Sequence, residues 1–311
     1  MASQPESFAN PKNLRFVITL GIQGKSFAGT PGDNTVTLSG LRASVIVENA
    51  GGAMMGTLRA QIFGMTANDM NTLTSTLWDT LVVGSKAPFA FNTVQVFAED
   101  GPQSTLVYNG VILNCWGVYT SMPEVYLMME AQIGYNQLVQ SSLPISVQSD
   151  TTVATIMGTL ASTMGFKLEN NGVNIAVPKG TYLGNTAMEQ ARMLAQMYRF
   201  WMYLDSTSPN TLAIAPYGKG RVTQVTPVIS AETGMMGYPL FNSTGVNFET
   251  KFNPGIVFGG PVQINSAIPK ANGTWTVVSM THHLTSQMPD GPWKSVINAV
   301  SPNLASTLQV P

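Results

Sequence analysis

The two histidines of the chain, His282 and His283, are its most obvious candidates for metal or acid–base chemistry. They are adjacent, within the sequence WTVVSMTHHLTSQMPDGPWKS at residues 275–295. The β-branched residues around them predict a strand, in which neighbouring side chains point to opposite faces. The pair therefore cannot share one metal site, and a zinc ion would need further ligands. We interpret both histidines as structural; the alternative is that one makes a pH-sensitive contact at an interface.

The remaining chemistry-bearing residues do not form a recognisable active site. The single cysteine, Cys115, lies in the apolar run VILNCWGVY, which predicts a buried and inert thiol. Paired carboxylates could indicate a glycosidase, but the candidates each flank a turn or strand end, which favours a solvated surface position: Glu48, Glu99, Asp100, Glu124 and Glu130. The sequence has no nucleophile elbow, phosphate loop or dinucleotide fingerprint. We therefore predict no catalytic, metal or cofactor site.

Few residues of the chain are charged. Asp, Glu, Lys and Arg make up 10% of the 311 residues, against about 25% in a typical soluble protein. Because 44% of the residues are hydrophobic, the chain is not of the disordered class. A neutral polar surface suits a protein covered by neighbours, since little charge has to be desolvated; secreted binding proteins share this composition. The net charge of −1 and the scattered basic residues give no footprint for nucleic acid.

Targeting signals are also missing from the sequence. The N-terminus, MASQPESFANPKN, lacks the basic and apolar regions of a signal peptide. No apolar run reaches the roughly 18 residues of a membrane span. We expect the protein to be made and folded in the cytosol.

The first part of the chain has the pattern of a β-domain. Apolar and polar residues alternate at 57–65, and a short helix capped by Asn68 follows. Turn residues separate the other strand-like segments, and we predict strands at 16–22, 41–49, 57–65, 93–100, 104–112, 110–119 and 125–133.

Helical periodicity begins after residue 143. In the segment 149–165, apolar residues mark one helix face, and Ser149 or Asp150 can cap its start. A second helix begins at Thr186, where the sequence TAME forms a capping box with Glu189. A hairpin follows these two helices, which completes a small α+β unit.

The resulting fold class is mainly β with an α+β insert. We predict an N-terminal β-domain at 1–143, an α+β domain of two helices and a hairpin at 144–216, and a C-terminal β-domain at 217–311, where strand patterns return.

The C-terminal third resembles the baseplate hub proteins of contractile phage tails. The resemblance is carried by GMMGYPLFNSTGVNFETKFNPGIVFGGPVQINS at 234–266 and NGTWTVVSMTHHLTSQMPDGPWKSVINAV at 272–300. The segments RAQIFGMTANDMNTLTST and VQVFAEDGPQSTLVYNGVILNC are similar to elements of tail-tube-like domains. The signature residues, to which the resemblance gives a structural role, are Phe252, Asn253, Pro254, Gly260, Trp275, Val277, His283, Pro289, Gly291 and Trp293.

This resemblance implies a structural virion protein and not an enzyme. Hub proteins of this kind form homotrimers in which each subunit contributes two tube-like antiparallel β-barrel or sandwich domains. The trimer is a pseudo-sixfold ring that joins the hexameric tail tube to the trimeric spike. The implied neighbours are the spike protein, the tail tube or distal tube proteins and the inner baseplate wedge proteins, with DNA and the tape measure passing through the lumen. No cofactor is implied.

The alternative from another functional class is a tail-associated peptidoglycan or glycan hydrolase, or a glycan-binding module. That reading would use exposed aromatic residues such as Trp116 and Trp201 as sugar platforms.

Overall fold

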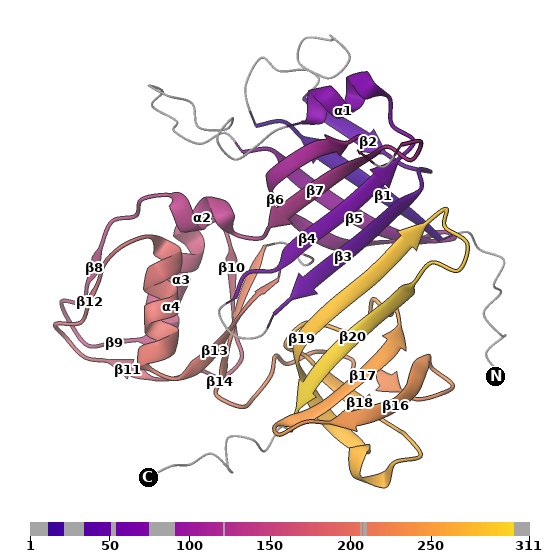
Figure 1. Ribbon diagram of the computed structural model, residues 1–311. Helices are drawn as coiled ribbons and strands as arrows, with labels where there is room; N and C mark the ends of the chain where they lie inside the picture. The colour runs from indigo at the N-terminus through magenta and orange to yellow at the C-terminus, as the bar shows by residue number, and fades with distance from the viewer. Residues whose placement is uncertain are drawn as a thin grey trace, which may run out of the picture. The chain divides into compact units, whose positions relative to one another are not determined.

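The computed structural model describes residues 12–21, 34–50, 54–74, 91–120, 122–205, 207 and 210–301. The chain is mainly β, as the sequence predicts, and its described strands pair mostly in antiparallel fashion (Figure 1). It divides into two compact units. The first comprises 1–47, 58–132 and 283–293; the second comprises 48–57, 133–282 and 294–311. The division into three domains inferred from the sequence stays a prediction.

The first unit is built on one sheet and a short helix. Its strands follow the order β3-β4-β7-β6-β5-β1-β2, and the end of β19 lies next to β3. The elements are β1 (Lys12–Thr19), β2 (Thr35–Leu38), β3 (Ala43–Asn49), β4 (Thr57–Phe63), α1 (Ala67–Leu73), β5 (Thr93–Asp100), β6 (Gln103–Val118) and β7 (Tyr126–Gln132).

Alternation along these strands places the apolar side chains on one face. In β1, Leu14, Phe16 and Ile18 are fully buried, while the residues between them are partly exposed. The exposed side carries ion pairs between neighbouring strands: Arg15 Nε donates to Glu99 Oε1 at 2.6 Å. The few charged side chains of these strands therefore lie on the solvent face of the sheet, and the core remains apolar.

Strand β6 differs from the prediction in one respect. The segments 104–112 and 110–119, predicted as two strands, form one strand of 16 residues that pairs with β5 and with β7. Its register shifts between Val96 and Phe97 on β5, and between Ile112 and Asn114 along β6 itself. Such bulges bend a strand without ending it, which is why two hairpins can share a single long strand.

The second unit begins with the helical segment. Its elements are α2 (Tyr135–Val139), β8 (Ile145–Ser146), β9 (Thr151–Thr152), α3 (Val153–Thr163), β10 (Lys167–Asn170), β11 (Ala176–Val177), β12 (Tyr182–Leu183), α4 (Ala187–Met197), β13 (Phe200–Asp205) and β14 (Thr211–Pro216). Strands β10, β14 and β13 form a small sheet in that order, with β10 parallel to β14.

The helix caps correct two details of the prediction. The capping box at Thr186 and Glu189 is confirmed. Helix α3, however, is capped by Thr152, because Asp150 lies before β9, where its carboxylate accepts the backbone N–H of Lys179 at 3.1 Å. Helix α1 is capped by Thr66, so that the predicted cap, Asn68, lies within the helix.

The C-terminal strands complete the second unit. They are β15 (Val228–Ile229), β16 (Met235–Phe241), β17 (Gly245–Lys251), β18 (Pro261–Ile264), β19 (Gly273–Ser286) and β20 (Trp293–Val300), with a short 3-10 turn at Pro269–Ala271. Their order is β16-β17-β20-β19, with β18 next to the start of β19 and β15 next to β18. Tyr203 and Ala213 of the β13–β14 hairpin belong to the same hydrophobic core as Phe248 and Val262. The hairpin and the C-terminal strands are thus one folded body.

Within the described part of the chain, no helix is both long and apolar enough to span a membrane. Most of the N-terminal stretch that lacks a signal-peptide pattern, namely residues 1–11, lies outside the described residues.

Cys115 provides a test of the core of the first unit. Burial raises the pKa of its thiol to about 12, and only 1% of the residue is exposed. Because the thiolate is the reactive species, iodoacetamide at pH 8 should leave the folded protein unmodified and alkylate it fully after denaturation, as measured by intact mass. The exposed position in Thr37→Cys serves as the reactive control. Rapid alkylation of the folded wild-type protein would contradict this packing.

Candidate functional site

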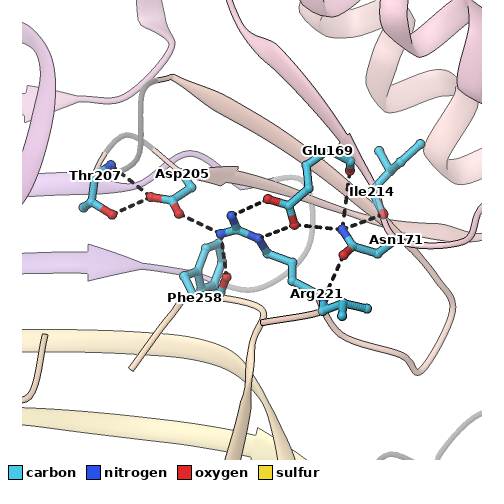
Figure 2. A network of polar contacts seen from close by, with 8 residues as sticks. Glu169, Asn171, Asp205, Thr207, Ile214, Arg221 and Phe258 are labelled. Carbon is cyan, nitrogen blue, oxygen red and sulfur yellow. Dashed lines mark hydrogen bonds and ion pairs between the residues drawn. The ribbon is translucent and has the colours of Figure 1, made fainter. Parts of the chain in front are cut away.

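A network of polar contacts in the second unit is centred on Arg221. Its guanidinium makes a two-pronged contact with Glu169 of β10, from Nε to Oε1 at 2.9 Å and from Nη2 to Oε2 at 2.7 Å. Nη1 donates to Asp205 Oδ2 at the end of β13, at 2.6 Å, and to the carbonyl of Phe258 at 3.2 Å. Figure 2 shows the guanidinium held between the two carboxylates. Arg221 thereby connects the small sheet of the helical segment with the loop before β18.

A second layer of hydrogen bonds fixes these carboxylates. Asn171 Nδ2 donates to Glu169 Oε1 at 2.9 Å, and its Oδ1 accepts the backbone N–H of Val222 at 2.8 Å (Figure 2). The backbone N–H and the hydroxyl of Thr207 both donate to Asp205 Oδ1, at 2.9 and 2.6 Å. The carboxylates are therefore occupied in holding Arg221, which favours a structural role over acid–base catalysis.

The electrostatics agree with a permanent ion cluster. Burial alone would lower the pKa of Arg221, but the hydrogen bonds and charges of Glu169 and Asp205 outweigh it, and the net shift is upward. The hydrogen bond from Arg221 lowers the pKa of Glu169 despite partial burial. Arg221 and Glu169 thus both favour their charged forms, as a buried ion pair requires.

Glycine makes the approach of Arg221 possible. The backbone N–H of Arg221 donates to the carbonyl of Gly259 at 2.7 Å. Gly259 has a φ of +81°, and a Cβ there would lie 2.9 Å from the ring of Tyr203. The GG pair at 259–260 therefore permits a close turn.

The histidines occupy different environments, as expected for neighbours on a strand. His282 is buried; its Nδ1 lies 2.7 Å from Ser295 Oγ, and its ring meets that of Phe252 edge-on at 5.2 Å. His283 is half-buried. Among the described residues, no three His, Cys, Asp or Glu side chains are grouped closely enough to hold a metal ion.

Six of the predicted signature residues lie in the second unit. Phe252 packs on His282, and Trp275 Nε1 donates to the carbonyl of Ala271 at 2.8 Å. Val277 is fully buried. The remaining three shape the turns between β17 and β18: Asn253 Oδ1 accepts the N–H of Gly255 at 2.8 Å, Pro254 follows in the same turn, and the N–H of Gly260 donates to Val257 at 2.9 Å.

The other four lie in the first unit: His283, Pro289, Gly291 and Trp293. Pro289, Gly291 and Trp293 line a shallow pocket of about 400 Å³, which also includes Lys12 and Met288. The Lys12 ammonium lies 5.9 Å from the centre of the Trp293 ring. A Cβ at Gly291 would lie 2.1 Å from Thr285 Oγ1, so the turn requires glycine there. The predicted role of these residues as a family signature stays a prediction.

The protein family described as baseplate hub gp41 matches residues 16–291. The chain belongs to the baseplate hub gp41 family. This confirms the resemblance recognised in the sequence: the family is one of structural proteins of the phage tail baseplate, and the chain is a virion component of that type.

Solved structures share the fold of this hub protein. The 43 kDa tail protein of prophage MuSo2 from Shewanella oneidensis is 11% identical, with a TM-score of 0.56, over 93% of this chain and 97% of that one. A tail protein from Neisseria meningitidis MC58 is 10% identical, with a TM-score of 0.59, over the same shares. The E. coli c3393 protein, a type VI secretion component with structural similarity to the T4 tail proteins gp27 and gp5, is 9% identical, with a TM-score of 0.53, over 84% and 73%. At these identities the likeness shows the fold alone. The search of curated protein sequences gave no match.

The candidate glycosidase carboxylates of this hub protein are mostly in ion pairs. Glu99 accepts from Arg15, and Asp100 pairs with Lys12. Glu124 Oε1 lies 3.0 Å from Arg42, Glu130 Oε1 lies 3.7 Å from Arg59, and Glu48 is exposed on β3. These contacts agree with the solvated-surface interpretation.

The aromatic residues considered as sugar platforms differ from one another. Trp116 is exposed. Trp201 is half-buried and packs on the hydrophobic core and on Tyr217, at 5.6 Å between ring centroids, so it is not the exposed platform that the alternative requires.

The Arg221 cluster was missed by sequence reasoning. Its partners lie 16 and 52 residues away along the chain, and no motif joins them. The available signal was a single arginine close to the start of a nearly uncharged stretch.

Replacing Arg221 should destabilise the second unit strongly. In Arg221→Met, two carboxylates are left without their cation, which costs about 3 to 5 kcal/mol for a buried pair; partial exposure of Glu169 favours the lower end. The matched control is Arg59→Met, whose ion pair is exposed and contributes less than about 1 kcal/mol. Urea unfolding at one protein concentration measures both. Equal losses of unfolding free energy in the two variants would contradict the stabilising role of the Arg221 cluster.

The lowered pKa of Glu169 predicts a pH dependence. A carboxyl group whose pKa is lower in the folded state adds stability above its ordinary value, here 4.5, and this stability is lost as the pH falls through the folded value. The difference in Tm between wild type and Glu169→Gln should therefore be largest near neutral pH and shrink below pH 4.5.

The Arg221→Met background provides the control for this titration. There the effect of Glu169→Gln should be small and nearly independent of pH, because the interaction that lowers the pKa is gone. An unchanged pH dependence in that background would show that another group causes it.

Proposed function

We propose that this protein forms the central hub of a phage baseplate as a homotrimeric ring. Each copy supplies two β-rich tube-like domains, so that three copies present six similar positions toward the hexameric tail tube and a threefold face toward the spike. The role is mechanical, and no residue of the chain is assigned a catalytic function.

The observation that carries the proposal is the match to the baseplate hub gp41 family over residues 16–291. The fold supports it, because the chain shares 93% of its length with tail proteins of similar architecture. Composition supports it as well. Because only 10% of the chain is charged, its surface can be covered by permanent neighbours at low desolvation cost. Permanent interfaces often bury more than about 2,000 Å².

The proposed neighbours are the spike protein, the tail tube or distal tube proteins and the inner wedge proteins of the baseplate. A spike-like partner is supported by the third structural relative, whose description relates it to gp27 and gp5 of the T4 tail. DNA and the tape measure are proposed to pass through the lumen. We expect a neutral to acidic lining there, since repulsion of phosphate prevents the wall from gripping DNA.

The purified protein, either alone or after addition of the spike protein, should have the mass of an assembly that contains three chains of 33.2 kDa. Light scattering or native mass spectrometry measures this mass. The matched control is bovine serum albumin or another monomer of known mass, run in the same buffer.

A different outcome would favour the hydrolase alternative. That outcome is a stable monomer, with and without the spike, that clears purified cell wall and loses the activity in Glu124→Gln or Glu130→Gln.

A further inference from the structure

Strand β16 exposes an unusual number of large apolar side chains for a strand of a folded unit. Its one strand neighbour among the described residues is β17, so the opposite edge of β16 is not covered by another described strand. Four of its large apolar side chains are exposed: Met236 by 45%, Tyr238 by 65%, Leu240 by 69% and Phe241 by 52%. Because Leu240 and Phe241 are adjacent, they point to opposite faces of the strand, and both faces present apolar surface.

No charge protects this edge. Soluble proteins commonly place lysine or another charge on an exposed edge strand to prevent pairing with another chain. Between Val222 and Phe248, the one charged residue is Glu232, which precedes β16. An exposed apolar strand without such protection is typical of a surface that another protein covers.

The backbone of β16 limits how a partner can bind. The register against β17 shifts between Met236 and Leu240, and Pro239 has no N–H to donate. A continuous ladder along β16 is therefore blocked in its middle. Hydrogen bonds remain available near Leu240 and Phe241, and the side chains must supply much of the contact.

Strand β2, at the edge of the first unit, has matching properties. Among the described strands it pairs with β1 alone. Residues 34–41 contain no charge, and Thr37 is exposed. One copy of the chain thus offers two unlike, uncharged edges, and pairing them would not bury a charge.

We infer that β16 of one copy docks against β2 of a second copy. A contact between two different surfaces is heterologous, and its repetition closes into a ring when the rotation permits. A contact of β16 with itself would instead give a twofold dimer. This inference rests on the proposed hub function and adds to it the surface through which copies meet.

Cysteine cross-linking tests the pairing directly. Opposed residues on neighbouring strands have Cβ atoms about 4.5–5.5 Å apart, within reach of a short bismaleimide. The chain carrying Leu240→Cys is mixed with the chain carrying Thr37→Cys, and the same mixture is made with Tyr238→Cys in place of Leu240→Cys. Native Cys115 is buried and does not compete.

The expected result is a covalent pair of two different chains in at least one of these mixtures, and a covalent trimer from the double variant Thr37→Cys/Leu240→Cys. Cross-linking of Leu240→Cys alone to itself would overturn the pairing with β2. Absence of any cross-link in a protein that is otherwise trimeric would place the contact elsewhere and leave the hub function standing.

A charge introduced on β16 tests the contact independently of cross-linking. Leu240→Lys should weaken self-association at least tenfold by light scattering, while Val225→Lys, at a similarly exposed position outside any strand, should not. Both residues are exposed, so the circular dichroism and Tm of each variant should match wild type. A Leu240→Lys protein that stays fully trimeric but loses the spike would overturn the inference and assign β16 to the spike. A wild-type protein that never associates would instead defeat the proposed function itself.

Discussion

The backbone N–H and C=O groups on both sides of a strand need hydrogen-bonding partners, and this need determines which surfaces of the protein stay open. Most strands of both units find those partners internally, but a sheet that does not close leaves edges. The chain does not protect the edge at β16 with charge, and its residues 222–248 are almost uncharged. The low charge content, the exposed apolar strand and membership in a family of baseplate hubs all agree with the proposed role as one subunit of a larger assembly.

The Arg221 cluster meets a related demand inside the second unit. The helical segment lies between β-rich parts of the sequence, and noncovalent contacts must fix its position against the C-terminal strands. Shared hydrophobic residues such as Tyr203 and Phe258, whose rings meet edge-on at 5.3 Å, supply the contact. Apolar packing tolerates side chains of different shape if their volume is similar, whereas a guanidinium held by two carboxylates requires one geometry. The cluster therefore specifies the arrangement that the apolar core stabilises.

Much of the fold could be predicted from the sequence because local rules decided it. The alternation in β4, the capping box at Thr186 and the β13–β14 hairpin each depend on neighbours in the chain. The failures have physical causes of the same kind. Thr152 caps α3 in place of Asp150, since a nearby loop uses the aspartate, and β6 continues through bulges that a period-two pattern does not register.

The candidate sites show the same division. The separation of the two histidines follows from strand geometry alone, and the inertness expected of Cys115 agrees with its burial. Arg221, Glu169 and Asp205 could not be joined from the sequence, because their proximity is made by the folding of distant segments. The edge position of β16 likewise requires the strand order, which no local pattern contains.

The proposed function places three copies of this chain in a hub ring at the end of the tail tube. A cryo-electron microscopy reconstruction of the intact tail tests it most directly. A hub ring requires three copies around the axis between tube and spike, with density in each copy that fits both units. Density for this chain in a peripheral fibre, or as a single copy off the axis, would contradict it.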